Sequence, residues 1–169
     1  MRGVDMLFKI CLPFLSLLCS SPSIANELSW DGFGDIKFGK SLEEISRTTG
    51  LEFVPTKGGT AWSEACKYVE VKGDSSIRFM VENGILTRAE VPVKTPTLFA
   101  INMSASLDKI KMQHPNAVVM NHKYVMEGHY IIFYSLDKSK ALLLEHYESK
   151  VQIMRAGMVP SVMYVESCL

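Results

Sequence analysis

The sequence lacks the short motifs that would assign it to a common enzyme class. It contains no G-x-S-x-G nucleophile elbow, and no glycine-rich phosphate loop follows a predicted strand. Its one Gly-Gly pair, Gly58-Gly59, lies in a predicted loop before Trp62. The acidic pair Glu43-Glu44 is explained by helix capping and solvation. These absences favour a binding protein over an enzyme, so no catalytic residue and no cofactor is predicted.

The chain also lacks an excess of charge of either sign. It has 18 Lys and Arg residues against 18 Asp and Glu residues, which gives a formal net charge of zero. Arg2, Lys9 and Asp5 lie in the first 25 residues, so the remainder keeps 16 basic and 17 acidic side chains. A nucleic-acid binder needs a basic face or stripe. The composition therefore excludes nucleic acid as the expected partner.

No apolar run reaches the roughly 20 residues that a helix needs to cross a bilayer. The apolar run Ile10–Leu18 instead follows a basic start and precedes small residues that end at Ala25. This pattern predicts a signal peptide over residues 1–25, with Met6 as an alternative start. An uncleaved membrane anchor is the alternative reading. A lipoprotein is disfavoured, because Leu18 precedes Cys19 where a small residue is needed.

Cysteine is scarce, with four residues in the chain. Cys11 and Cys19 belong to the predicted leader, which leaves Cys66 and Cys168 in residues 26–169. Two cysteines in an oxidising compartment are expected to pair. The disulfide would close a loop of about a hundred residues and stabilise the fold by at most roughly 4–5 kcal/mol. A metal site is the alternative, but it would need two further ligands. The expected location is the periplasm or the exterior.

An internal similarity appears when the chain is aligned with itself at a shift of 65 residues. Residues 35–45 then fall on residues 100–110, with identical Ile, Ser, Leu and Ile at four positions. The same shift places Ile77, Phe79 and Leu86 on apolar residues, and it places the Asn83-Gly84 pair on Glu148-Ser149. One offset that matches both a helix start and a turn predicts two tandem units, about 33–97 and 98–167, in a single α+β domain over 26–169.

Each unit is predicted to contain a short strand, a capped helix and antiparallel hairpins. Ser41, with Glu44, and Ser106 are the expected helix N-caps, and Pro115 should end the second helix. Asn83-Gly84 is a strong signal for a type I′ turn. About nine strands are expected, forming a pair of twisted antiparallel sheets, each with its helix on one face. The predicted later strands are Lys67–Val71, Ser76–Glu82, Ile85–Val93, Val118–Val125, Gly128–Ser135, Ala141–Tyr147, Val151–Ala156 and Val162–Glu166.

The motif Ile36-x-Phe38-Gly39-x-Ser41-Leu42-x-x-Ile45 carries a resemblance. Tandem units of this kind resemble the fold of the secreted beta-lactamase inhibitor proteins, and a single unit resembles the small outer-membrane-assembly lipoproteins. The inhibitors close each unit with its own disulfide, whereas here one bridge would span both units. More broadly, the chain is similar to exported bacterial proteins of unassigned function. The stretches that match are 66–68, 79–84, 122–124 with 128–130, 155–157 and 165–168. The resemblance implies an α+β fold and a protein partner.

The strongest candidate binding surface lies around the stretch 122–130. A two-residue turn at 126–127 or 127–128 would place His122, Tyr124 and His129 on one face of a hairpin, with Tyr130 extending it. Trp62, next to flexible glycines and the expected disulfide, is the other candidate contact. The alternatives for this face are a metal site with two visible ligands, an acid/base pair, or an ordinary sheet edge. No metal ligand is assigned.

These features together predict a periplasmic or secreted protein-binding protein that is not an enzyme. Within that class, the expected role is that of an inhibitor or immunity-type protein against an envelope enzyme or an incoming toxin. An envelope assembly or scaffold module is the second hypothesis. A hydrolase or metal-binding protein that uses the His122/His129 face is the third, because fold similarity alone does not choose between these classes.

Overall fold

The computed structural model describes residues 26–57, 63, 65–166 and 168. The predicted signal peptide, residues 1–25, and Trp62 lie outside the described residues. Neither helix in the described part of the chain has the length and hydropathy that crossing a membrane requires. The chain is α+β with antiparallel sheets, as predicted.

The chain forms a small N-terminal sheet and then two runs of helix and strands. The small sheet consists of β1 (Leu28–Ser29), β2 (Gly32–Phe33) and β3 (Ile36–Lys37). The first run consists of α1 (Leu42–Thr49), β4 (Phe53–Pro55), β5 (Cys66–Val71), β6 (Asp74–Glu82) and β7 (Ile85–Val91). The second consists of α2 (Leu107–Gln113), β8 (Val118–Asn121), β9 (His129–Tyr134), β10 (Lys140–Tyr147), β11 (Lys150–Met158) and the 3-10 helix η1 (Ser161–Met163).

Both helices begin at the predicted caps. The Ser41 hydroxyl accepts the backbone N–H of Glu44 at 3.1 Å, and the Ser106 hydroxyl accepts that of Lys109 at 3.4 Å. The Glu44 carboxylate binds Lys40 at 2.7 Å, so it pairs with a charge rather than completing the expected capping box. Helix α2 ends at Gln113, two residues before Pro115, as predicted.

Strands β4 to β11 form one continuous sheet rather than the expected pair. Its order is β4-β5-β6-β7-β11-β10-β9-β8, and all neighbouring strands are antiparallel. The two strand groups join because β7 pairs directly with β11, with Arg88 opposite Gly157. A Cβ at Gly157 would lie 2.2 Å from the Thr87 carbonyl oxygen, so this junction requires glycine.

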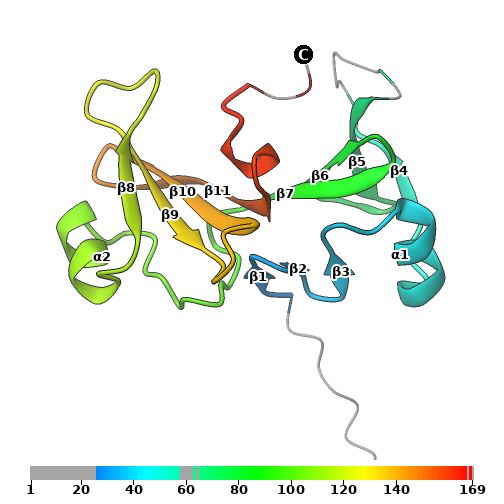
Figure 1. Ribbon diagram of the computed structural model, residues 1–169, viewed down its shortest axis with the longest axis horizontal. Helices are drawn as coiled ribbons and strands as arrows, with labels where there is room; N and C mark the ends of the chain where they lie inside the picture. The colour runs from blue at the N-terminus through cyan, green and yellow to red at the C-terminus, as the bar shows by residue number, and fades with distance from the viewer. Residues whose placement is uncertain (1–25, 58–62, 64, 167, 169) are drawn as a thin grey trace, which may run out of the picture.

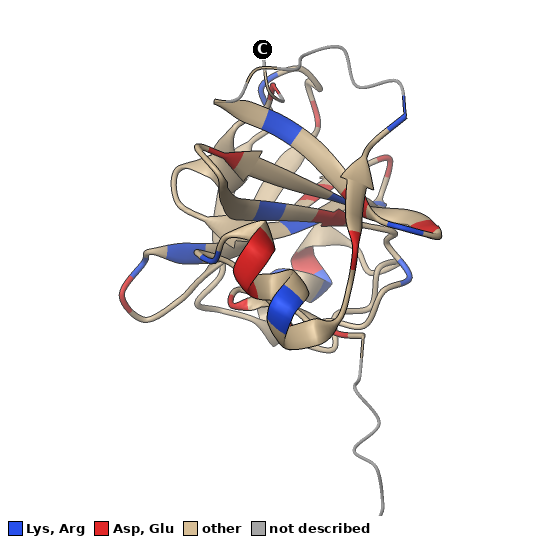
Figure 2. Cartoon of the chain, turned by 90° about the vertical axis from the view of Figure 1, so that its right-hand side faces the viewer, with Lys and Arg blue, Asp and Glu red and all other residues tan. Residues whose placement is uncertain are grey.

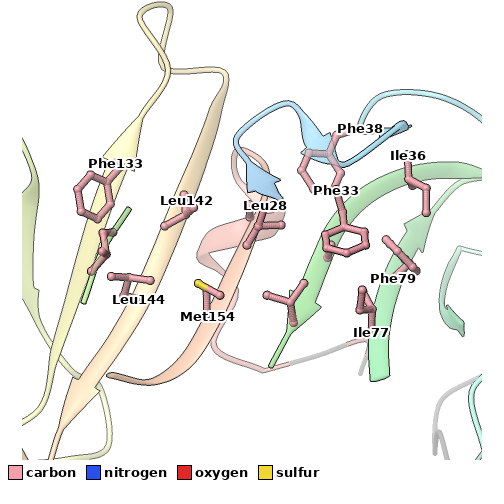
Figure 3. Close-up of a cluster of buried hydrophobic side chains, with 14 of the residues drawn as sticks. Leu28, Phe33, Ile36, Phe38, Ile77, Phe79, Phe133, Leu142, Leu144 and Met154 are labelled. Atoms are coloured by element: carbon pink, nitrogen blue, oxygen red, sulfur yellow. The ribbon is translucent and has the colours of Figure 1, made fainter. Parts of the chain in front are cut away.

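The apolar core lies between the eight-stranded sheet and the elements on one of its faces. Figure 1 shows both helices and the three-stranded sheet on that side, while the C-terminal segment crosses the other side. We call the first side the covered face and the second the open face. Figure 3 shows side chains of the small sheet, including Leu28 and Phe33, above core residues of both strand groups such as Phe79 and Leu144.

The C-terminal segment differs from its prediction. Residues 162–166 were expected to form a strand, but the segment forms η1 and then irregular structure. Its carbonyl groups are bound by arginine side chains of the sheet rather than by a neighbouring strand: Arg88 donates to the Ser161 and Tyr164 carbonyls, and Arg155 donates to that of Val162. Cys168 then forms the predicted disulfide with Cys66, with a Cα–Cα distance of 5.4 Å.

Candidate functional site

The loop between β8 and β9 is longer than the predicted two-residue turn. Strand β8 ends at Asn121 and β9 begins at His129, and these two residues lie opposite each other in the sheet. Seven residues, 122–128, therefore connect the strands. The tight-hairpin prediction is wrong. The expectation that His122, Tyr124 and His129 share one face was based on that turn, so it loses its basis.

His122 and His129 lie on opposite faces of the sheet. The His122 ring stacks on Tyr130 with 4.5 Å between ring centroids, and Tyr130 belongs to an apolar cluster on the open face with Ile132 and Val162. His129 precedes Tyr130 on the same strand, so its side chain points to the covered face. There it lines a small pocket with His146, near the start of α2. The expectation that His122, Tyr124 and His129 share one face is wrong.

The His122 side chain is held by three hydrogen bonds and is only 6% exposed. Its Nδ1 accepts the backbone N–H groups of Tyr124 and Val125, each at 3.1 Å. Its Nε2 lies 3.1 Å from a carboxylate oxygen of Glu145. Because Nδ1 accepts two hydrogen bonds, the network assigns the ring proton to Nε2, which donates to Glu145. His122 therefore folds its own loop and ties it to β10.

Glu145 connects His122 to a buried arginine. One carboxylate oxygen binds His122 and the other accepts a hydrogen bond from Nη1 of Arg155. Arg155 is 4% exposed, and its Nε donates to the Val162 carbonyl at 2.9 Å. This first network joins the 122–128 loop, β10, β11 and the C-terminal segment.

A second buried network lies on the open face of the first strand group. Glu90 accepts hydrogen bonds from Arg88, from Arg78 and from the Tyr68 hydroxyl, the last at 2.9 Å. Burial opposes ionisation of Glu90, but the Arg88 and Arg78 charges, with the hydrogen bonds from Tyr68 and Arg78, hold the pKa of Glu90 below its usual value. The carboxylate is therefore fixed in its charged form. Arg88 is 2% exposed and also binds the C-terminal segment through Ser161 and Tyr164.

The two networks meet at the centre of the sheet and line one cleft. Glu90 on β7 lies directly opposite Arg155 on β11. The cleft has a volume of about 740 Å³ and opens on the open face. Its charged and histidine lining residues are Arg78, Arg88, Glu90, His122, Glu145 and Arg155, and its apolar lining includes Val91, Pro92, Val93, Ile153 and Val165. In Figure 2, basic and acidic residues are interspersed along the strands of the sheet.

The 122–128 loop and the C-terminal segment meet at the rim of this cleft. The Glu166 carboxylate accepts hydrogen bonds from Lys123 at 2.8 Å and from the Tyr124 hydroxyl. These hydrogen bonds, the Lys123 one foremost, lower the pKa of Glu166 to about 2. Tyr124 also lines the cleft and remains 63% exposed. Of the predicted contact residues, the structure thus brings His122, Tyr124 and Tyr130 together and separates His129 from them.

The described residues contain no group of three or more His, Cys, Asp or Glu side chains placed to hold a metal ion. Comparison with known protein families, characterised proteins and solved structures finds no match.

Sequence reasoning missed the residues that build the cleft. Arg78, Arg88, Glu90, Glu145 and Arg155 were not singled out, although a signal was present. In the run Ile77 to Glu82, the apolar side chains at odd positions alternate with Arg78 and Glu82, so the polar side chains share the face opposite the core. The alternation of side chains along the strand shows which of them share a face, but it does not predict that the C-terminal segment buries that face.

Proposed function

We propose that the chain is an exported protein-binding protein, not an enzyme, that presents the open face of its sheet to a protein partner. The observation that carries this proposal is the cleft of about 740 Å³, whose walls come from both strand groups and are held by paired buried charges. Pairing of this kind makes a surface rigid before it binds, which lowers the entropic cost of association.

The ionisable groups of the cleft are arranged for recognition rather than for proton transfer. Glu90 and Glu145 each accept from two or more donors, and Glu90 is held in its ionised form. Both ring nitrogens of His122 are engaged. A general acid or base needs a proton-exchanging atom that can reach a substrate. A joint His122/His129 site, metal-binding or hydrolytic, lacks support because the two rings lie on opposite faces.

Two tandem units, 33–97 and 98–167, would explain why the walls of the cleft come from two similar strand groups. The N-caps Ser41 and Ser106 are 65 residues apart, and the hairpin turns at 83–84 and 148–149 both have positive φ at both positions. The strand order is the same when read from either edge of the sheet. Glu90 and Arg155, also 65 residues apart, lie opposite each other at the centre. Duplication of one unit is the simplest source of this arrangement.

The proposed role is that of an inhibitor or immunity-type protein in the periplasm or outside the cell. The Cys66–Cys168 disulfide supports an oxidising compartment. An assembly or scaffold module would use the same face, and the identity of the captured partner distinguishes the two roles.

Affinity capture with residues 26–169 as bait tests the proposal. Ile153 is 38% exposed and lines the cleft, whereas Met112 is 75% exposed on α2, away from the open face. Wild type and Met112→Arg should retain the same protein from a periplasmic extract, and Ile153→Arg should lose it. Equal recovery by all three baits, or recovery of no protein, would contradict the proposal.

A further inference from the structure

The hydrogen-bonding capacity of the cleft is unbalanced. Its two carboxylates are fully engaged, Glu145 by Arg155 and His122, and Glu90 by Arg88, Arg78 and Tyr68. By contrast, Nε of Arg88 and Nη2 of Arg155 are buried and have no hydrogen-bond partner among the described residues. A buried donor without an acceptor is costly and is rare in folded proteins. After this pairing, each of the two buried arginines keeps one donor atom that no described residue accepts.

The charge of the lining is unbalanced in the same direction. Three guanidinium groups, those of Arg78, Arg88 and Arg155, face two carboxylates. His122 adds no charge as the Nε2–H tautomer. Arginine remains protonated in proteins, so the excess positive charge is permanent. A ligand that carries one negative charge would correct the charge imbalance at the exposed guanidinium of the lining, that of Arg78.

The cleft offers such a ligand an accessible cation at its mouth. Arg78 is 53% exposed and lies over the Tyr68 ring at 5.3 Å, which orients the guanidinium plane. The exposed residues Ser75 and Ser76 lie next to it and line the same cleft. A planar guanidinium with neighbouring hydroxyl groups matches the two oxygens of a carboxylate.

The remaining walls of the cleft are apolar. Pro92 and Val93 follow the end of β7 at Val91, and the partly exposed Ile153 lies on β11. A free inorganic anion would leave these side chains uncovered, whereas an acidic residue with an apolar neighbour would contact both parts of the lining.

We propose that the cleft binds a carboxylate carried beside an apolar residue on the partner protein, with Arg78 as the first contact and the apolar wall as the second. This inference rests on the proposed function, since it names the feature of the partner that the open face recognises. Charge-assisted hydrogen bonds to the carboxylate supply the specificity, and the neutral amide analogue should bind about tenfold more weakly or worse.

Calorimetric titration of residues 26–169 tests this with three probes: the peptide acetyl-Val-Glu-Leu-amide, its Gln counterpart, and glutarate. The Glu peptide should bind at least about tenfold more tightly than the Gln peptide. Arg78→Gln should remove that difference. Arg47→Gln, a matched change at an exposed position of α1, should preserve it. The Arg78 Nε–H resonance should shift on addition of the Glu peptide, which reports directly on the first contact.

Equal affinity for the Glu and Gln peptides, or an unchanged preference in Arg78→Gln, would overturn the inference. Glutarate binding as tightly as the Glu peptide would also overturn it, because the cleft would then be a site for free carboxylates. If the open face captures a partner but the Glu and Gln peptides bind equally, this inference is refuted and the proposed function is unaffected. If the Glu peptide binds more tightly than the Gln peptide but capture of a partner does not depend on the open face, the result supports carboxylate binding by the cleft and contradicts the proposed protein-binding function.

Discussion

The two faces of the eight-stranded sheet are both buried over much of their area, but by different means. On the covered face, helices and the small sheet pack on an apolar layer that includes Phe79 and Leu144. On the open face, the same strands bury Arg88, Glu145 and Arg155 beneath the C-terminal segment. The first face depends on shape and apolar area, and the second on the pairing of charges. Variants on the two faces should therefore differ in how much stability they lose.

Removal of a core aromatic ring on the covered face should lower the free energy of unfolding the most. Phe79 is 0% exposed and packs edge-to-face on Phe53, with 5.9 Å between the ring centroids. Phe79→Ala should lower the free energy of unfolding by about 4 kcal/mol, since it removes apolar contact and leaves a cavity. Urea unfolding measures the loss. Met120→Ala, at a 48% exposed position on edge strand β8, is the control and should change stability by less than about 0.5 kcal/mol. Equal losses would contradict the apolar role of this face.

On the open face, removing one member of a buried ion pair should lower the free energy of unfolding more than removing both members. Glu145→Ala leaves the buried Arg155 guanidinium without its carboxylate and should cost about 3 kcal/mol. The double variant Glu145→Leu/Arg155→Met removes both charges and should recover most of that loss. Urea unfolding of both variants gives the comparison. If the double variant is less stable than Glu145→Ala, this face depends on something other than charge pairing.

The disulfide should contribute somewhat less, because the C-terminal segment keeps its arginine contacts without it. The bridge closes a loop with a sequence separation of 102 residues. Chain entropy sets an upper limit of roughly 4.7 kcal/mol for a loop of this size, and native disulfides usually deliver less. Cys66→Ser/Cys168→Ser should lower the free energy of unfolding by about 2–3 kcal/mol. A reductant should have the same effect on wild type and none on the double variant. A reductant that destabilises both proteins equally would refute this assignment.

The comparison of the faces also shows what sequence patterns could and could not predict. Both hairpin turns were located, Asn83-Gly84 from its composition and Glu148-Ser149 only from the shift of 65 residues. His146 pairs with Val151 across the second turn, as a two-residue turn at 148–149 requires. Short-range patterns of this kind carry their own physical cause, since turn residues and alternation are local properties.

The open face was harder to predict because its order depends on contacts distant in sequence. The faces of His122 and His129 were misassigned because their strands are joined by seven residues instead of two, and loop length decides side-chain parity. The strand expected at 162–166 is absent because arginines 7 to 76 residues away in sequence bind the backbone of this region. Alternation indicates which side chains share a face, but it does not reveal what will cover them.

Acid should weaken the open face through Glu90. Its pKa in the folded protein lies below the ordinary value of 4.5, so at low pH the unfolded chain takes up the proton more readily than the folded one. The stabilisation by Glu90 is therefore present above about pH 4.5 and is lost as pH falls below it. Glu90→Gln should flatten the dependence of the free energy of unfolding on pH between 5 and 3, whereas Glu43→Gln, on exposed α1, should not. Parallel pH curves for wild type and Glu90→Gln would show that the carboxylate is not stabilised by its arginines.

The rim of the open face should show the smallest effect. Lys123 and Glu166 form an ion pair at 2.8 Å, but their side chains are 53% and 41% exposed. Solvent screening and the side-chain entropy lost on pairing leave little net stabilisation in such a pair, even though the hydrogen bonds from Lys123 and Tyr124 lower the pKa of Glu166 to about 2. Glu166→Gln should leave the urea midpoint unchanged within error while hydrogen exchange of the Tyr164 and Val165 amides becomes faster. A lowered midpoint would mean that the rim, and not only the buried networks, holds the C-terminal segment on the sheet. The open face would then depend on exposed as well as buried charge pairs, which would change the physical basis of the contrast with the covered face.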